Sequence, residues 1–82
     1  MSQPEHQQAW DAGDLGCGDL VIRSYFLLQE MRPREIIRVH ATDTGAPHDL
    51  PAGCRMTGER LVEHDCERDF YWIQRKGERA DP

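Results

Sequence analysis

The sequence has no long apolar run: none of its apolar segments approaches the ~20 residues that a membrane-spanning helix needs. Its first residues are polar, so we expect no signal peptide and no membrane partner. Basic residues are few as well, with 10 Lys and Arg against 15 Asp and Glu and a formal net charge of -5. Because a nucleic-acid binder normally presents a basic face, direct binding to nucleic acid is not expected.

Cysteine occurs only three times, at irregular spacing. An odd and irregular set favours a reducing compartment over a disulfide framework, so we expect a cytoplasmic protein. Metal ligands are also too few, because His64 and Cys66 share one predicted strand whereas a zinc site needs four ligands in a tetrahedral array. The sequence therefore predicts no metal and no cofactor.

The length of 82 residues allows one small domain, which is only modestly stable without cross-links such as disulfides or a structural metal. No internal repeat and no low-complexity segment is present. We expect a disordered lead-in over residues 1–6, a single domain over 7–76 and a polar tail over 77–82.

The first half of the chain changes from a strand pattern to a helix pattern. Residues 7–11, with Ala9 and Trp10, predict a short strand that ends in a glycine-rich loop. Residues 18–31 have helical periodicity, and Pro33 ends this helix because proline cannot continue it. The face of this helix that we expect to be buried comprises Leu20, Val21, Ser24, Leu27, Leu28 and Met31.

A second strand and a second helix follow. Residues 35–41 alternate between apolar and polar side chains, which predicts a strand with one buried face. A turn-rich loop then leads to a short helix over residues 48–57, in which Leu50 and Cys54 are expected to be buried. Pro51 is tolerated there because it lies in the first turn of the predicted helix.

Residues 59–66 and 69–75 predict an antiparallel hairpin with a tight turn. In its second strand Phe70 and Trp72 share a face, which we assign to the core. The order β-α-β-α-β-β predicts an α/β two-layer sandwich, in which a four-stranded mixed sheet carries two helices on one face.

The stretch over residues 11–19 places Cys17 between a short apolar segment and the start of the first helix. A thiol at a helix start lies near unpaired backbone N–H groups and the positive end of the helix dipole, which favour thiolate over thiol. Cys17 is therefore the candidate catalytic residue. The residues that support it, in the loop and at the helix start, are Leu15, Gly16, Gly18 and Asp19.

Ile22, Phe26 and, less clearly, Tyr25 lie off the predicted buried face of the first helix, close to the end that carries Cys17. Two interpretations stay open at this point. These side chains pack under a loop or the N-terminal strand, or they form a docking patch for a protein partner.

With these elements in place, the chain resembles the TusA/SirA family of small sulfur carriers. The resemblance covers residues 7–76 without obvious gaps. The matching segments are Trp10-Asp11-Ala12, Leu15-x-Cys17, Arg32-Pro33-x-Glu35, Ala41-Thr42-Asp43-x-Gly45-Ala46, Asp49-Leu50-Pro51-Ala52-x-Cys54 and Arg75-Lys76.

The resemblance implies a two-layer α/β sandwich and a sulfurtransferase-like role for Cys17, which carries sulfur as a persulfide. The implied donor is a cysteine desulfurase or another sulfurtransferase, and the implied acceptor is a downstream protein. The sulfur relay then leads, for example, towards tRNA thiolation, molybdenum-cofactor assembly or sulfur oxidation. A small carrier that exchanges partners is expected to be a monomer.

The chain departs from the family at its cysteine motif. The family has Cys-Pro-x-Pro, often preceded by Arg, whereas this chain has Gly16-Cys17-Gly18-Asp19-Leu20. The nearby carboxylates of Asp14 and Asp19 raise the pKa of a thiol and oppose the helix dipole. The alternative hypothesis is therefore a non-catalytic binding or regulatory module of the same fold.

Two further residues carry alternatives. Asp43 is expected to form an Asx-type turn, and a role in partner recognition comes second. Cys54 is favoured as a small buried hydrophobe, and its functional alternative is a resolving thiol for Cys17.

Overall fold

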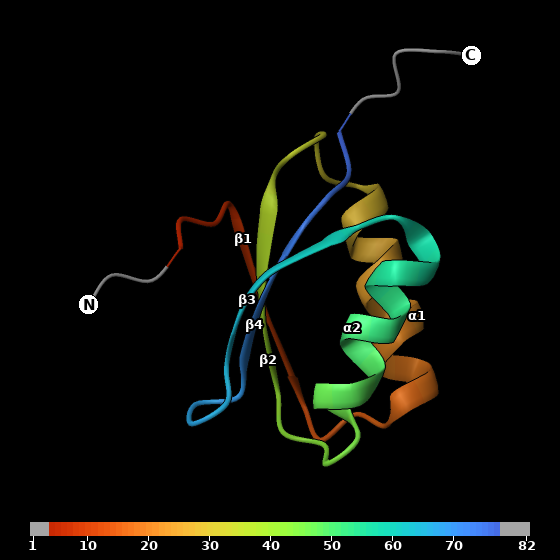
Figure 1. Cartoon of the computed structure of the whole chain (residues 1–82), viewed down its shortest axis with the longest axis vertical. Helices are drawn as coiled ribbons and strands as arrows, with labels where there is room; N and C mark the ends of the chain where they lie inside the picture. Colours follow the sequence, from red (N-terminus) through yellow and green to blue (C-terminus); the bar gives the residue numbers. More distant parts are fainter. Residues whose placement is uncertain (1–3, 78–82) are drawn as a thin grey trace.

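The computed structural model describes residues 4–77 and consists of one mixed sheet with two helices packed on one of its faces (Figure 1). The predicted two-layer α/β sandwich with the order β-α-β-α-β-β is confirmed. Most of the predicted lead-in and tail lies outside the described residues, and residues 4–6 have no helix or strand. The elements are β1 (Gln8–Gly13), α1 (Cys17–Gln29), β2 (Ile36–Ala41), α2 (Ala46–Thr57), β3 (Arg60–Asp65) and β4 (Phe70–Gln74).

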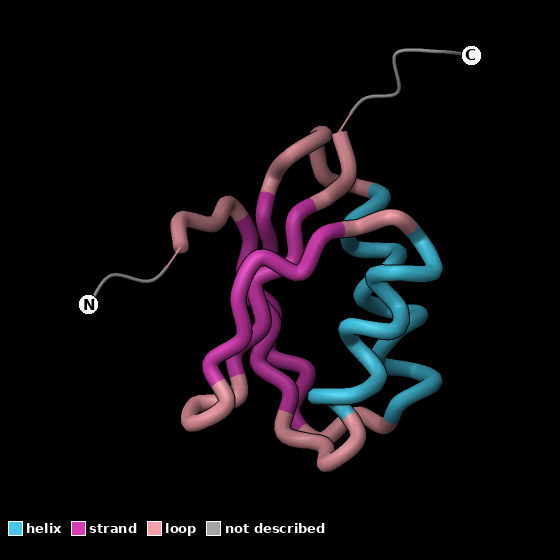
Figure 2. Tube along the Cα trace, in the orientation of Figure 1, coloured by secondary structure: helices cyan, strands magenta, loops and turns pink. Residues whose placement is uncertain are grey.

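The strand order in the sheet is β1-β2-β4-β3. β1 and β2 are parallel, while β4 is antiparallel to both β2 and β3. Both helices run in the same direction on one side of this sheet (Figure 2), and each follows directly on the carboxyl end of a parallel strand. The loops that enter α1 and α2 therefore lie together at one end of the molecule.

Helix α1 is held to the sheet by a stripe of buried side chains, as its periodicity predicts. Leu20, Ser24 and Leu28 are 0 to 4% exposed, and Met31 follows just beyond the helix. Their spacing of four residues places them on one face of the helix. Val21 and Leu27, at the edges of the predicted face, are only half-buried.

Helix α2 begins at Ala46, two residues earlier than predicted. Pro51 consequently lies inside the helix rather than in its first turn, so the usual helical bond to the carbonyl of Pro47 cannot form. Leu50 and Cys54 are buried as predicted. Gly58 ends the helix with a φ of 85°, a conformation that favours glycine.

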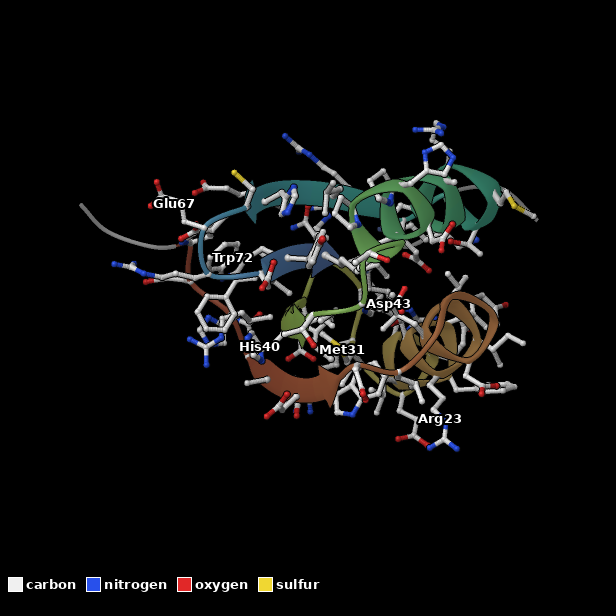
Figure 3. The ribbon with its side chains drawn as sticks, turned by 90° about the horizontal axis from the view of Figure 1, so that it is seen from below. Arg23, Met31, His40, Asp43, Glu67 and Trp72 are labelled. Atoms are coloured by element: carbon white, nitrogen blue, oxygen red, sulfur yellow. The ribbon has the colours of Figure 1, made fainter. Side chains whose placement is uncertain are left out.

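The assignment of Phe70 and Trp72 to the core-facing side of β4 is wrong. Tyr71 and Ile73 face the helices instead, opposite Val39 and Ile37 of β2. Trp72 is fully buried, but it lies with His40 on the side of the sheet away from the helices (Figure 3). Because β4 carries large apolar residues on both faces, alternation cannot identify its inner face, and the register with β2 decides it.

Candidate functional site

The candidate site is the end of the molecule at which β1 passes into α1. Gly13 ends β1 with a φ of 60°, and its amide donates to Asp11 Oδ1 at 3.0 Å. The carbonyl of Gly13 then accepts a bond from the amide of Thr42 at 2.8 Å, which ties this loop to the one after β2. A third bond, from the Leu15 amide to the Ala12 carbonyl at 3.2 Å, closes the turn.

Helix α1 begins at Cys17, one residue before the predicted start. Gly16 occupies the N-cap position in an extended conformation and provides no side-chain hydrogen bond to the first turn. The first N–H groups of the helix therefore have no side-chain cap, and the positive end of the dipole lies at Cys17. A Cβ atom at Gly16 or Gly18 would meet nothing within 4 Å, so the backbone on both sides of the cysteine has open space.

The neighbouring loop, between β2 and α2, has the Asx-type turn that the sequence predicts at Asp43. The Gly45 amide donates to Asp43 Oδ2 at 2.9 Å, and the Ala46 amide donates to the Asp43 carbonyl at 3.0 Å. A Cβ atom at Gly45 would lie 2.9 Å from Asp49 Oδ2 and 3.1 Å from Asp43 Oδ2. Because Gly45 has no side chain, the carboxylates of Asp43 and Asp49 can both lie against the backbone at the start of α2.

The third segment at this end is the hairpin turn between β3 and β4, because the Ala41 amide donates to the Asp69 carbonyl at 3.0 Å. Together the three loops and the adjoining helix turns are strongly acidic. Within the described segments 11–19, 40–49 and 65–70, Arg68 is the one arginine and there is no lysine. The carboxylates of these segments are Asp11, Asp14, Asp19, Asp43, Asp49, Asp65, Glu67 and Asp69.

Next to this end, α1 exposes an apolar patch. Ile22 is 54%, Tyr25 38% and Phe26 61% exposed, and the rings of Tyr25 and Phe26 lie 6.0 Å apart. Met56 of α2, which is 86% exposed, lines the same groove, which extends to Lys76 at the opposite end of the helices. The interpretation in which these α1 side chains pack under a loop or strand is therefore wrong. Sequence analysis missed Met56, although its position two residues after the buried Cys54 places it off the buried face.

The other two cysteines differ in their exposure to solvent. Cys54 is buried against the sheet, and burial, reinforced by the charge of Glu59, raises the pKa of its thiol to about 11. It is thus protonated at neutral pH, and the interpretation as a buried hydrophobe is confirmed. Cys66 lies just beyond β3 and is exposed.

On the opposite face of the sheet lies a polar pair that the sequence does not reveal. His40 Nδ1 and Asp11 Oδ1 are 3.1 Å apart, and this bond is the main reason why the pKa of Asp11 is lowered. The Arg38 guanidinium lies 4.4 Å from the centre of the Phe70 ring, in cation–π geometry. Only the parallel register of β1 and β2 brings Asp11 beside His40.

Among the side chains that the structure describes, no group of three from His, Cys, Asp or Glu is placed to hold a metal ion. Nor does any helix within residues 4–77 have the length and apolarity to cross a membrane.

Comparison with known proteins finds several similar sequences, although no family model matches. The candidate sulfur carrier protein YrkI of Bacillus subtilis is 37% identical over 67 residues, which cover 79% of this chain and 89% of YrkI. The sulfur carrier protein TusA of Pseudomonas paraeruginosa is 31% identical over 70 residues, covering 83% of this chain and 89% of TusA. A third candidate sulfur carrier, NMA0882 of Neisseria meningitidis, is 34% identical over 58 residues, 71% of this chain and 78% of that protein.

Proposed function

Because the chain belongs to the TusA-like family of sulfur carrier proteins, we propose that it carries sulfur as a persulfide on Cys17. The observation that carries this proposal is the place of Cys17 as the first residue of α1, where no side chain caps the helix. Unpaired N–H groups and the helix dipole favour a negative charge on sulfur at that position.

The transfer is a thiol exchange. The Cys17 thiolate attacks the outer sulfur of a persulfide on the donor, a new S–S bond forms on Cys17, and the S–S bond of the donor breaks. The donor leaves as a thiolate and takes up a proton, so no external oxidant or reductant is consumed. The same exchange then passes the sulfur from Cys17 to a cysteine of the acceptor.

Cys54 has no part in this relay, because a buried and protonated thiol is a poor nucleophile. The proposed donor is a cysteine desulfurase or another sulfurtransferase, and the acceptor is a downstream sulfur-acceptor protein. A persulfide relay needs reduced thiols, which favours the cytoplasm, and a carrier that alternates between partners is best served by a monomer.

The proposed partner surface combines the Cys17 and Asp43 loops with the exposed patch of Ile22, Tyr25 and Phe26. An apolar patch of this kind next to a reactive residue fits protein docking. Since the loops around Cys17 are acidic, the matching partner surface is basic around its own reactive sulfur. Such a surface also compensates for the carboxylates of Asp14 and Asp19, which disfavour a thiolate.

The experiment is intact-mass measurement after incubation with a cysteine desulfurase and cysteine, on the native chain and on Cys17→Ser. We expect the native chain to gain the mass of one sulfur atom, reversibly on reduction, and Cys17→Ser to gain none. Cys66→Ser is the matched control, because it removes an exposed thiol away from the start of α1 and should leave the gain unchanged.

The replacement of the family's two prolines by Gly18 and Leu20 motivates the second candidate function, a binding or regulatory module without transfer. If the native chain gains no sulfur from several donors while Cys17 remains alkylatable, the carrier proposal fails. A partner that binds native chain and Cys17→Ser equally well then supports the module.

A further inference from the structure

A small cavity lies between the two helices and the sheet, away from the Cys17 loop. It is bounded by apolar side chains from three elements, among them Leu28, Leu50 and Ile73, and has a volume of about 20 Å³. A site of ~10–15 Å³ already holds one water molecule, provided that at least two polar groups face it. The cavity is therefore large enough for one water and too small for a larger ligand.

Two residues on its lining each carry a buried oxygen atom that has no hydrogen-bond partner among residues 4–77. Ser24 of α1 is 4% exposed and Glu59, just before β3, is 7% exposed, and both line the cavity. Ser24 Oγ and Glu59 Oε2 are fully buried and unpartnered, whereas Glu59 Oε1 accepts a bond from the Lys76 amide at 2.6 Å. A buried carboxylate oxygen without a partner carries a large desolvation cost.

We propose that one ordered water molecule occupies this cavity and bridges Ser24 Oγ to Glu59 Oε2. The water donates one hydrogen to the carboxylate and accepts the hydroxyl hydrogen of Ser24, so both oxygen atoms are satisfied. The thiol of Cys54, on the same lining, is a third and weaker donor.

The bridge gives a reason for the one polar residue on the buried face of α1. Ser24 lies between Leu20 and Leu28, where an apolar side chain is expected, and the water links it to Glu59. Glu59 in turn holds the chain that follows β4 through Lys76. The water thus ties the helix that begins at Cys17 to the β3–β4 side of the sheet.

The direct test is a crystal structure of the native full chain at a resolution that shows water. We expect density for one water within about 2.6–3.2 Å of both oxygen atoms. Three observations overturn the proposal: no density in the cavity, a direct bond between Ser24 and Glu59, or a Glu59 side chain turned to solvent.

A double-mutant cycle in urea unfolding tests the bridge in solution, with Ser24→Ala, Glu59→Gln and the double variant. Each single change is expected to raise the unfolding equilibrium constant by about tenfold, the size of one lost buried polar contact. In the double variant, the unfolding equilibrium constant is expected to rise clearly less than the product of the two single increases, since one water serves both groups. Independent effects contradict the bridge.

The matched control is Thr57→Val combined with Glu59→Gln. Thr57 lines the same cavity, but its hydroxyl already donates to the Gly53 carbonyl at 3.0 Å. The effects of Thr57→Val and Glu59→Gln on the unfolding equilibrium constant should therefore be independent, so that they multiply in the double variant. Coupling as strong as that of Ser24 would show that the cycle reports general packing and would overturn the assignment.

Discussion

The two ends of the molecule use charge in opposite ways. At the Cys17 end, acidic side chains form turns or lie exposed, and Asp14 and Asp19 make no ion pair within residues 4–77. At the far end, cationic side chains bond to the backbone: Arg75 donates to the Met31 carbonyl, and Lys76 Nζ donates to the Thr57 carbonyl at 3.1 Å. Charged side chains at the far end therefore bond within the fold, whereas Asp14 and Asp19 at the Cys17 end stay exposed to solvent.

This contrast predicts the largest stability loss at the far end. Arg75→Ala removes a partly buried guanidinium and leaves the Met31 carbonyl without this donor, which should cost about 1–3 kcal/mol of unfolding free energy. The measurement is urea denaturation followed by tryptophan fluorescence. Arg55→Ala, an exposed residue of the same end, is the control and should change the free energy by less than about 0.5 kcal/mol. Equal losses of unfolding free energy in the two variants would show that the bond from Arg75 to the backbone does not stabilise the fold.

At the Cys17 end, charge changes should alter the reactivity of Cys17 more than the stability of the fold. Asp14→Asn with Asp19→Asn removes two exposed carboxylates near Cys17, and we expect its alkylation at pH 7 to become about 2–5 times faster. The rate is measured by mass spectrometry on a Cys66→Ser background. An unchanged rate would show that these carboxylates do not act on the thiol.

A smaller effect is expected from proline at the helix start. Gly18 is in the first turn of α1, where proline is tolerated, and a Cβ atom there meets no neighbour. Gly18→Pro restores one proline of the family motif and should stabilise the fold by about 0.4–1 kcal/mol through the unfolded chain. Thermal unfolding checks the sign, and a loss of stability would mean that this turn needs the freedom of glycine.

The smallest effect concerns Asp11 and His40. Hydrogen bonding lowers the pKa of Asp11 below its ordinary value of 3.8, so its stabilising contribution is fully present above that value and disappears as the pH falls through the lowered pKa. The unfolding free energies of the native chain and of Asp11→Asn are measured from neutral to acid pH. Plotted against pH, the two curves should converge below about pH 4. Curves that stay parallel would exclude a folded-state interaction of Asp11.

Local patterns predicted much of the site. Helical periodicity located the buried residues of α1, the glycine-rich loop placed Cys17 at a helix start, and the Asx turn of Asp43 followed from its turn sequence. These features depend on residues within a few positions of one another, which is why a sequence pattern contains them.

The tertiary structure decided what depends on distant partners. The register between β2 and β4 turned Tyr71 towards the helices and Trp72 away from them, although both are large and apolar. The packing of α1 against the sheet left Ile22 and Phe26 exposed, an outcome that their positions on the helix left open.

The sequence by itself determined the order of the elements, the family and the position of Cys17 at the start of a helix, because each depends on short-range patterns and motifs. The tertiary structure alone decided that three acidic loops lie at one end of the molecule and that Ser24 and Glu59 line one cavity. These groups lie far apart along the chain, and only strand register and helix packing bring them together.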